Sequence, residues 1–292
     1  MTTTRRVSAN GIQLHAELAG EGPEIPMVFL HGWLRSTLEW HLLFPHLATV
    51  APCVALDLPG FGLSDIPDAT YDMPYFRDTL WAALDALGLD RVRLVGHGLG
   101  GAAAFAMALA QPGRVASIVA ASPTVFPSTR AGLRAQILVK GPVGKIYFER
   151  FFNRTRLRDM LINVHYHEPL HVTDAVIDPI MTWLARPGAR LAAWKSLVTD
   201  LDTGVGKDLG ALTTPSAVIW GYNDRIHPVD LGKRMEKEFE PIKLKQIPNA
   251  GYQIIEDRPA SVARYLVGHF KLPLPPGIPD GHPTPEEGDY DT

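Results

Sequence analysis

The composition is that of an ordinary folded chain, and it excludes several classes of function. The 292 residues suffice for one large α/β domain with an insertion. A formal net charge of −3 gives no basic surface for nucleic acid or for an anionic membrane. The single cysteine, Cys53, excludes an internal disulfide and a cysteine-based metal cluster.

The start of the chain and its hydropathy bear on location. The first six residues read Met-Thr-Thr-Thr-Arg-Arg, and no apolar run follows them, so no signal peptide is predicted. No stretch is apolar over the length that a bilayer requires. We therefore expect a cytoplasmic protein that binds neither membranes nor nucleic acid.

Short apolar runs bounded by turn residues predict eight strands. The first two flank Asn10-Gly11, a hairpin signal, and the others alternate with helical patterns at 75–87, 102–110 and 228–239. The predicted strands are 5–9, 12–18, 27–30, 53–56, 92–95, 115–120, 217–220 and 242–247. Strands that alternate with helices indicate a mostly parallel sheet with helices on both faces, and active groups in such sheets lie at the carboxyl ends of strands.

The pattern changes between the sixth and seventh strands, where helical, Arg-rich and aromatic segments replace strand signals. We expect helices at 145–152, 156–164, 174–184 and 190–197, forming a lid over the active edge of the sheet. The predicted organisation is a core domain in two parts, 1–124 and 210–271, with the lid at 125–209. Residues 272–292 are rich in Pro, Gly and acidic residues, which predicts a loose tail.

The most informative segment follows the fifth predicted strand. Residues 95–101 read Val-Gly-His-Gly-Leu-Gly-Gly and open an Ala-rich helix. This is the strand–turn–helix context of the G-x-S-x-G elbow, which presents a nucleophilic side chain. The position of the nucleophile is Gly98, which has no side chain that could attack a substrate.

Together with four other segments, this elbow resembles the α/β-hydrolase superfamily. The other segments are the turn His31-Gly32-Trp33, the Asp-Leu-Pro-Gly-Phe-Gly-Leu-Ser-Asp run at 57–65, the loop at 220–228 that contains Asp224, and the run at 249–253 that contains Tyr252. The resemblance extends from residue 5 to residue 270 and is strongest to epoxide hydrolases, dehalogenases and carbon–carbon bond hydrolases. It implies an eight-stranded α/β-hydrolase fold with a helical lid, and a triad acid at Asp224.

Two of the three implied triad positions depart from the family pattern. Gly98 stands at the nucleophile and Tyr252 at the histidine, so neither a nucleophile nor a base is present at the matching positions. Gly98 either relieves backbone strain after a loss of function or makes room for a ligand. Tyr252 is either a packing residue or a hydrogen-bond donor and general acid. Asp224 either holds Tyr252 or a loop amide, which we favour, or acts as the base itself.

Backbone groups and neighbouring side chains complete the predicted site. The resemblance implies an oxyanion hole formed by the amides of Trp33 and Leu99, which survives any side-chain change. Predicted substrate contacts are His31, Arg35, His97 and Tyr222, although His31 also suits a structural brace and Arg35 a solvated cation. His165, His167 and His171 are not spaced to share one helical face, so no metal site is predicted.

These features lead to one principal hypothesis of function and two alternatives. The principal hypothesis is a cofactor-independent, non-hydrolytic enzyme, a lyase, cyclase or isomerase, that acts on a small carbonyl-containing, polyketide-like metabolite with Tyr252 as donor. The first alternative is a non-catalytic ligand-binding protein. The second is an atypical or engineered hydrolase in which Asp224 activates water. The expected partner is a small molecule, and the expected assembly is a monomer or homodimer.

Overall fold

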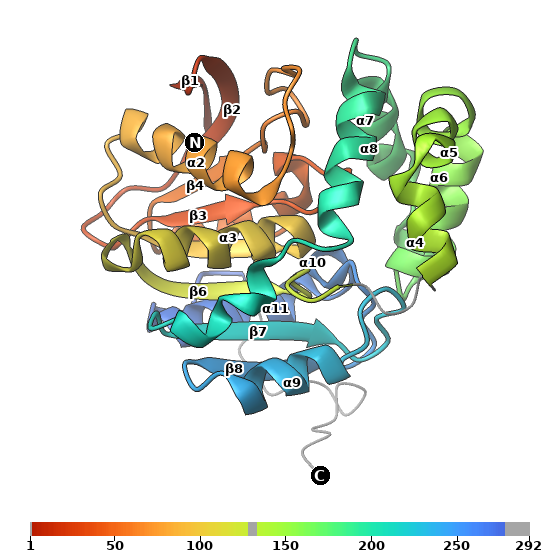
Figure 1. Cartoon of the computed structure of the whole chain (residues 1–292). Helices are drawn as coiled ribbons and strands as arrows, with labels where there is room; N and C mark the ends of the chain where they lie inside the picture. Colours follow the sequence, from red (N-terminus) through yellow and green to blue (C-terminus); the bar gives the residue numbers. More distant parts are fainter. Residues whose placement is uncertain (1, 128–132, 278–292) are drawn as a thin grey trace.

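A single eight-stranded sheet organises the computed structural model, which describes residues 2–127 and 133–277 (Figure 1). The sheet order is β1-β2-β4-β3-β5-β6-β7-β8. The strands are β1 Thr3–Ala9, β2 Ile12–Ala19, β3 Met27–Leu30, β4 Cys53–Leu56, β5 Val92–His97, β6 Val115–Ala121, β7 Ser216–Gly221 and β8 Ile242–Ile247. β2 pairs antiparallel with β1 and β4, and the pairs from β4 onward are parallel. All eight strands predicted from the sequence are therefore confirmed.

Helices cover both faces of the sheet because successive strand residues point to opposite sides. The helices outside the insertion are α1 Phe44–Leu47, α2 Met73–Ala86, α3 Gly98–Ala110, α9 Asp230–Glu238, α10 Ile254–Asp257 and α11 Pro259–Phe270. In β3, Val28 and Leu30 pack into the cluster that includes α2 and α3, whereas Met27 and Phe29 pack into the cluster that includes α1 and α11. Cys53 is buried in the second cluster, and burial raises the pKa of its thiol to about 12.

The helix that follows β5 begins earlier than the sequence pattern predicts. α3 starts at Gly98 rather than at Ala102. Glycine has a low helix propensity, so the three glycines at 98, 100 and 101 conceal the first turn. The shift matters for the site because it places residue 98 at the amino end of the helix.

In the described residues between β6 and β7, an insertion supplies five further α-helices, which we call the cap helices. They are α4 Leu133–Lys140, α5 Pro142–Ile146, α6 Arg154–Met160, α7 Asp174–Leu184 and α8 Ala189–Asp200, with π-helical turns at Tyr147–Phe151 and Leu161–His165. Figure 1 shows them gathered at the end of the sheet toward which β7 points. Side-chain donors attach them to the core, because Trp183 Nε1 donates to the Gly60 carbonyl and Trp33 Nε1 to the Ala193 carbonyl, each at 3.0 Å.

The beginning of the predicted loose tail packs against the core. Leu272 and Pro275 are buried, and the carbonyl of Pro276 lies 3.3 Å from His46 Nδ1. Residues 278–292 of the predicted tail lie outside the described residues. Within the described part of the chain, no helix is long and apolar enough to cross a membrane.

Candidate active site

The elbow between β5 and α3 adopts the left-handed backbone that a nucleophile turn requires. Gly98 has a φ of +48°, a conformation that glycine adopts at little cost and other residues adopt with strain. The turn is also tightly packed, since a Cβ on Gly100 would lie 2.2 Å from the Leu30 carbonyl oxygen. The glycine pattern thus lets the first turn of α3 rest directly on the end of β3.

Tyr252 occupies the space beside Gly98. A Cβ on Gly98 would lie 1.9 Å from the Tyr252 hydroxyl oxygen and 3.0 Å from Cζ. The tyrosine side chain is 3% exposed. The phenol oxygen therefore lies where a side chain at residue 98 would begin.

The environment of Tyr252 keeps its hydroxyl protonated. Burial raises its pKa well above the usual value, and the negative charges of Asp200, Glu39 and Asp224 raise it further. A neutral phenol is a hydrogen-bond donor at physiological pH and a poor base. The predicted donor chemistry of Tyr252 agrees with this environment.

Three histidine rings surround Tyr252, and two of them were not assigned to the site from the sequence. Its ring centroid lies 4.4 Å from that of His97, 5.2 Å from that of His165 and 5.6 Å from that of His227. His165 comes from the insertion, where burial lowers its pKa to about 3, so this ring is neutral. His227 lies in the same loop as Asp224. Only the folded chain brings these rings to one place.

Asp224 holds the loop that follows β7. Its Oδ1 accepts hydrogen bonds from the backbone amides of Ile226 at 2.7 Å and His227 at 2.8 Å. This is the loop-amide role favoured from the sequence. Its Oδ2 is buried, and the Ser122 hydroxyl is a side-chain group that interacts with this carboxyl. Burial raises the pKa of Asp224 to about 6.

Asp200, a second acid near Tyr252, was missed from the sequence. It ends cap helix α8 and accepts a hydrogen bond of 2.7 Å from the Thr124 hydroxyl. Burial raises its pKa to about 6, and among the charged groups it has the largest effect on the pKa of Tyr252. No motif marks Asp200, because its place depends on how the cap helices return to the core. Two carboxyl groups with raised pKa values thus act on one buried phenol.

The turn at His31-Gly32-Trp33 packs against the elbow. A Cβ on Gly32 would lie 2.7 Å from His97 Nδ1, so this turn and β5 are in direct contact. Leu99 is in the first turn of α3, where backbone amides have no acceptor within the helix and the helix dipole is positive. These contacts bring the two backbone segments of the predicted oxyanion hole together.

Glu39 joins the separate segments of the site and was also missed from the sequence. It lies in the 3-10 turn Thr37–Trp40 and is fully buried. Its carboxylate accepts from the Gly32 amide at 2.8 Å, from His97 Nδ1 at 2.8 Å and from Gln253 Nε2. One carboxylate therefore fixes the His31-Gly32-Trp33 turn, the elbow and the Tyr252 loop.

His97 is a buried cation paired with Glu39. Its Nδ1 faces the Glu39 carboxylate and its Nε2 lies 3.0 Å from the Tyr252 carbonyl oxygen. Both partners are acceptors, so both ring nitrogens donate. Burial lowers the pKa of His97, but the Glu39 carboxylate outweighs it and the net shift is upward. Burial likewise acts to raise the pKa of Glu39, and the neighbouring cations lower it to about 2.

Three of the predicted substrate contacts are buried and hydrogen-bonded within the fold. His31 donates from Nδ1 to the Gly32 carbonyl at 2.8 Å and accepts at Nε2 from the Leu58 amide at 2.9 Å, which fits the brace. The ring nitrogens of His97 are bonded as described above. Arg35 is buried against Glu39 and Glu256, so the expectation of a solvated cation is wrong.

Tyr222, the fourth predicted substrate contact, lies at the surface with 59% of its side chain exposed. It is not part of the buried cluster around Tyr252, because the loop after β7 turns its side chain outward while Asp224 turns inward.

Within the described ranges, no group of three or more His, Cys, Asp or Glu side chains is arranged to hold a metal ion.

Comparison with known proteins shows which family this chain resembles in sequence. A family model described as alpha/beta hydrolase fold matches residues 25–259. A 2-hydroxy-6-oxononadienedioate/2-hydroxy-6-oxononatrienedioate hydrolase from Paraburkholderia xenovorans is 30% identical over 256 residues, which cover 82% of this chain and 84% of the relative.

Among solved structures, epoxide hydrolase CorEH superposes with a TM-score of 0.80 at 21% identity, covering 93% of this chain and 99% of the other. Haloalkane dehalogenase DatA from Agrobacterium tumefaciens superposes with a TM-score of 0.78 at 22% identity, covering 92% and 96%. These structural likenesses concern the fold. With a family model matched over most of its length, the chain belongs to the alpha/beta hydrolase family.

Proposed function

We propose that the chain is a cofactor-independent enzyme that acts on a small carbonyl-containing molecule by proton transfer, without a covalent intermediate. The observation that carries this proposal is the position of the Tyr252 hydroxyl, 1.9 Å from the site of a Cβ on Gly98. Residue 98 aligns with the family nucleophile by motif, and residue 252 with the family histidine. A proton donor thus occupies the space of an attacking group, and acyl-enzyme chemistry has no nucleophile there.

The surroundings of Tyr252 support enolate chemistry. A carbonyl oxygen bound at the amides of Trp33 and Leu99 would accept a hydrogen bond from the neutral phenol, and such donors stabilise the charge that develops on oxygen. The pKa values of Asp200 and Asp224, both about 6, leave these groups mostly ionised at pH 7 and able to accept a proton.

A balanced step follows from these roles. One carboxylate removes a proton from the carbon beside the carbonyl, and the electron pair moves to the oxygen, which the phenol and the amides stabilise. In an isomerase the carboxylic acid then returns the proton to another carbon of the conjugated system. In a lyase a neighbouring bond breaks and the carboxylic acid gives the proton to the leaving group. In a cyclase the enolate carbon attacks a second carbonyl carbon, whose oxygen takes the proton; none of these reactions consumes water.

The names of the relatives suggest a probe. Several relatives are 2-hydroxy-6-oxononadienedioate hydrolases, and this compound carries an enol and a ketone in one conjugated chain. In deuterated water we expect the protein to accelerate deuterium incorporation into the carbon chain over a protein-free control, with the chain intact by mass spectrometry. Saturable binding without any exchange would instead support the non-catalytic ligand-binding alternative.

A second candidate function is hydrolysis by water activated at Asp224. The buried Oδ2, on a carboxyl group with a pKa of about 6, supports this candidate. It predicts cleavage of the probe with one oxygen from ¹⁸O-labelled water in a product, and loss of cleavage in Asp224→Asn. Intact probe with deuterium in its carbon chain would contradict it.

A further inference from the structure

The cap carries a cluster of exposed apolar residues on its outer surface. The helices α4 and α5 and the π-helical turn Tyr147–Phe151 follow one another along the chain, and Figure 1 shows α4 and α5 at the outer edge of the molecule. Five large apolar residues of this stretch are each more than half exposed, and we call them the cap outer face. They are Ile137, Leu138, Val143, Ile146 and Phe151. Exposed apolar clusters mark surfaces that contact a protein or a membrane.

The inner side of the same stretch is already packed, so these residues are not waiting for the core. Phe148 and Phe152 are buried, and their ring centroids lie 5.0 Å apart. Phe151, between them in sequence, turns to solvent. Val143 and Ile146 are three residues apart on α5, a spacing that places both on one side of a helix. The stretch therefore has a buried side and a separate apolar side that faces water.

Basic side chains accompany the cap outer face. Residues 137–158 include six Lys or Arg and one Glu, so the net charge of −3 for the whole chain conceals a basic segment. Two of the six pair with carboxylates of α7. Lys140 and Arg150 are exposed, and Lys145 is partly exposed at 3.9 Å from Glu149. Each of these three cations stands within two residues of an apolar member of the face.

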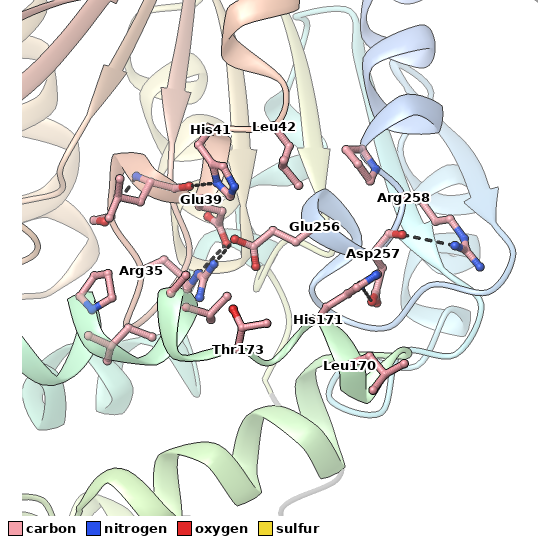
Figure 2. A pocket seen from close by; sticks show the side chains of 17 residues that line it. Arg35, Glu39, His41, Leu42, Leu170, His171, Thr173, Glu256, Asp257 and Arg258 are labelled. Carbon is pink, nitrogen blue, oxygen red and sulfur yellow. Dashed lines mark hydrogen bonds and ion pairs between the residues drawn. The ribbon is translucent and has the colours of Figure 1, made fainter. Parts of the chain in front are cut away.

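A second group of exposed apolar residues has no such excess of cations. Leu38, Leu42 and Leu170 line a cavity of about 590 Å³ between the 3-10 turn Thr37–Trp40, α7 and α10 (Figure 2). The lining of this cavity contains three carboxylates and two guanidiniums. An anionic surface therefore finds complementary charge at the cap outer face and not at the cavity.

We propose that the cap outer face docks on the surface of a bilayer that contains anionic lipids. Its apolar side chains enter the boundary between headgroups and acyl chains, and Lys140, Lys145 and Arg150 contact the lipid phosphates. A second copy of the chain fits this face less well, because two-fold pairing would bring the same cations together. The proposal departs from the expectation, drawn from the net charge, that the chain binds no membrane. It is independent of the function proposed for Tyr252.

Flotation of the full chain with lipid vesicles tests the proposal. One set of vesicles contains phosphatidylcholine alone, and the other contains phosphatidylcholine mixed with anionic phosphatidylglycerol. We expect the chain to partition roughly ten- to a hundredfold more strongly onto the mixed vesicles, because three cations then meet anionic headgroups. Raising the salt concentration should reduce this difference, since the charges are screened.

Three variants separate the contributions of charge and apolar surface. Combining Lys140→Gln, Lys145→Gln and Arg150→Gln should lower partitioning onto mixed vesicles to the level of phosphatidylcholine vesicles. Ile146→Ser combined with Phe151→Ser should weaken partitioning onto mixed vesicles roughly tenfold or more, because less apolar area leaves water. Leu170→Ser is the matched control, since Leu170 is 83% exposed in the same insertion but lies at the cavity, and it should leave partitioning unchanged.

Several results would overturn the proposal. The wild-type chain would fail to float with mixed vesicles, would partition equally onto both kinds of vesicle, or would lose as much partitioning through Leu170→Ser as through the double serine variant. Sedimentation velocity without vesicles examines the rival occupant. A wild-type dimer that Phe151→Ser dissociates would assign the face to a second copy of the chain and would also overturn the proposal.

Discussion

Replacing Gly98 by alanine tests the packing of Tyr252 against the elbow. The backbone φ of +48° should cost about 1–2 kcal/mol for a residue with a Cβ. The methyl group would also lie 1.9 Å from the Tyr252 hydroxyl oxygen, and such overpacking costs roughly 1–3 kcal/mol. We therefore expect Gly98→Ala to lower the free energy of unfolding by about 2–5 kcal/mol, a large share of the stability of a typical domain.

A double-mutant cycle with Tyr252→Phe separates the cost of the strained backbone from the cost of overpacking. Phenylalanine removes the clashing oxygen, so the nearest atom to the new Cβ is Cζ at 3.0 Å instead of the oxygen at 1.9 Å, while the backbone strain remains. The destabilisation by Gly98→Ala should therefore be about 1–3 kcal/mol smaller in the Tyr252→Phe background. Urea-induced unfolding followed by circular dichroism measures all four proteins.

A matched control isolates the strain. Gly11→Ala introduces a Cβ at a φ of +81° with no atom within 4 Å, so it reports the left-handed backbone alone. It should cost about 1–2 kcal/mol and show no coupling to Tyr252→Phe. If the effects of Gly98→Ala and Tyr252→Phe add within about 0.5 kcal/mol, the phenol does not occupy the space beside residue 98 and the reasoning fails.

Three further predictions concern chemistry, pH and the buried ion pair. Gly98→Ser alone should not hydrolyse nitrophenyl esters, whereas Gly98→Ser with Tyr252→His should, because Asp224 can then orient a base; equal rates in the two variants would contradict this. Asp224 binds its proton more tightly in the folded chain, where its pKa is about 6 against the ordinary value of 3.8. Its contribution to the free energy of unfolding therefore falls as the pH rises from about 4 to 6, and it stays lost above pH 6. Asp224→Asn should reduce this slope and raise the free energy of unfolding at pH 8 by about 1–3 kcal/mol, and an unchanged slope in urea unfolding measured across pH would refute this. Glu39→Gln should cost about 3–5 kcal/mol because it leaves the His97 cation buried without its partner, and a thermal midpoint equal to that of the wild type would show that the pair is not ionised.

The sheet could be predicted from the sequence because its signals are local. Each strand is a short apolar run between turn residues, and the alternation of strands with helices dictates parallel pairing. The start of α3 could not be predicted, since the glycines that permit the close contact with Leu30 also lower helix propensity. The same residues that build the elbow thus obscure the element that carries it.

The candidate site was predictable only where a motif marks it. Gly98 and Tyr252 stand in recognisable segments, so their proximity followed from the family pattern. Glu39 and Asp200 belong to no motif, and their roles come from burial and from partners far away in the chain. Tyr222 shows the converse, because its segment was recognised correctly and yet the loop directs its side chain to solvent.

The rate of deuterium incorporation into 2-hydroxy-6-oxononadienedioate by the wild type and by Tyr252→Phe tests the central claim most directly. Both rates are measured at saturating probe, with the dissociation constant determined in parallel. The account predicts a rate roughly ten- to a thousandfold lower in Tyr252→Phe, the range for a lost acid or oxyanion donor, with probe binding weaker by no more than about 1 kcal/mol. Equal rates in the two proteins, or no exchange above the protein-free control in the wild type, would contradict it.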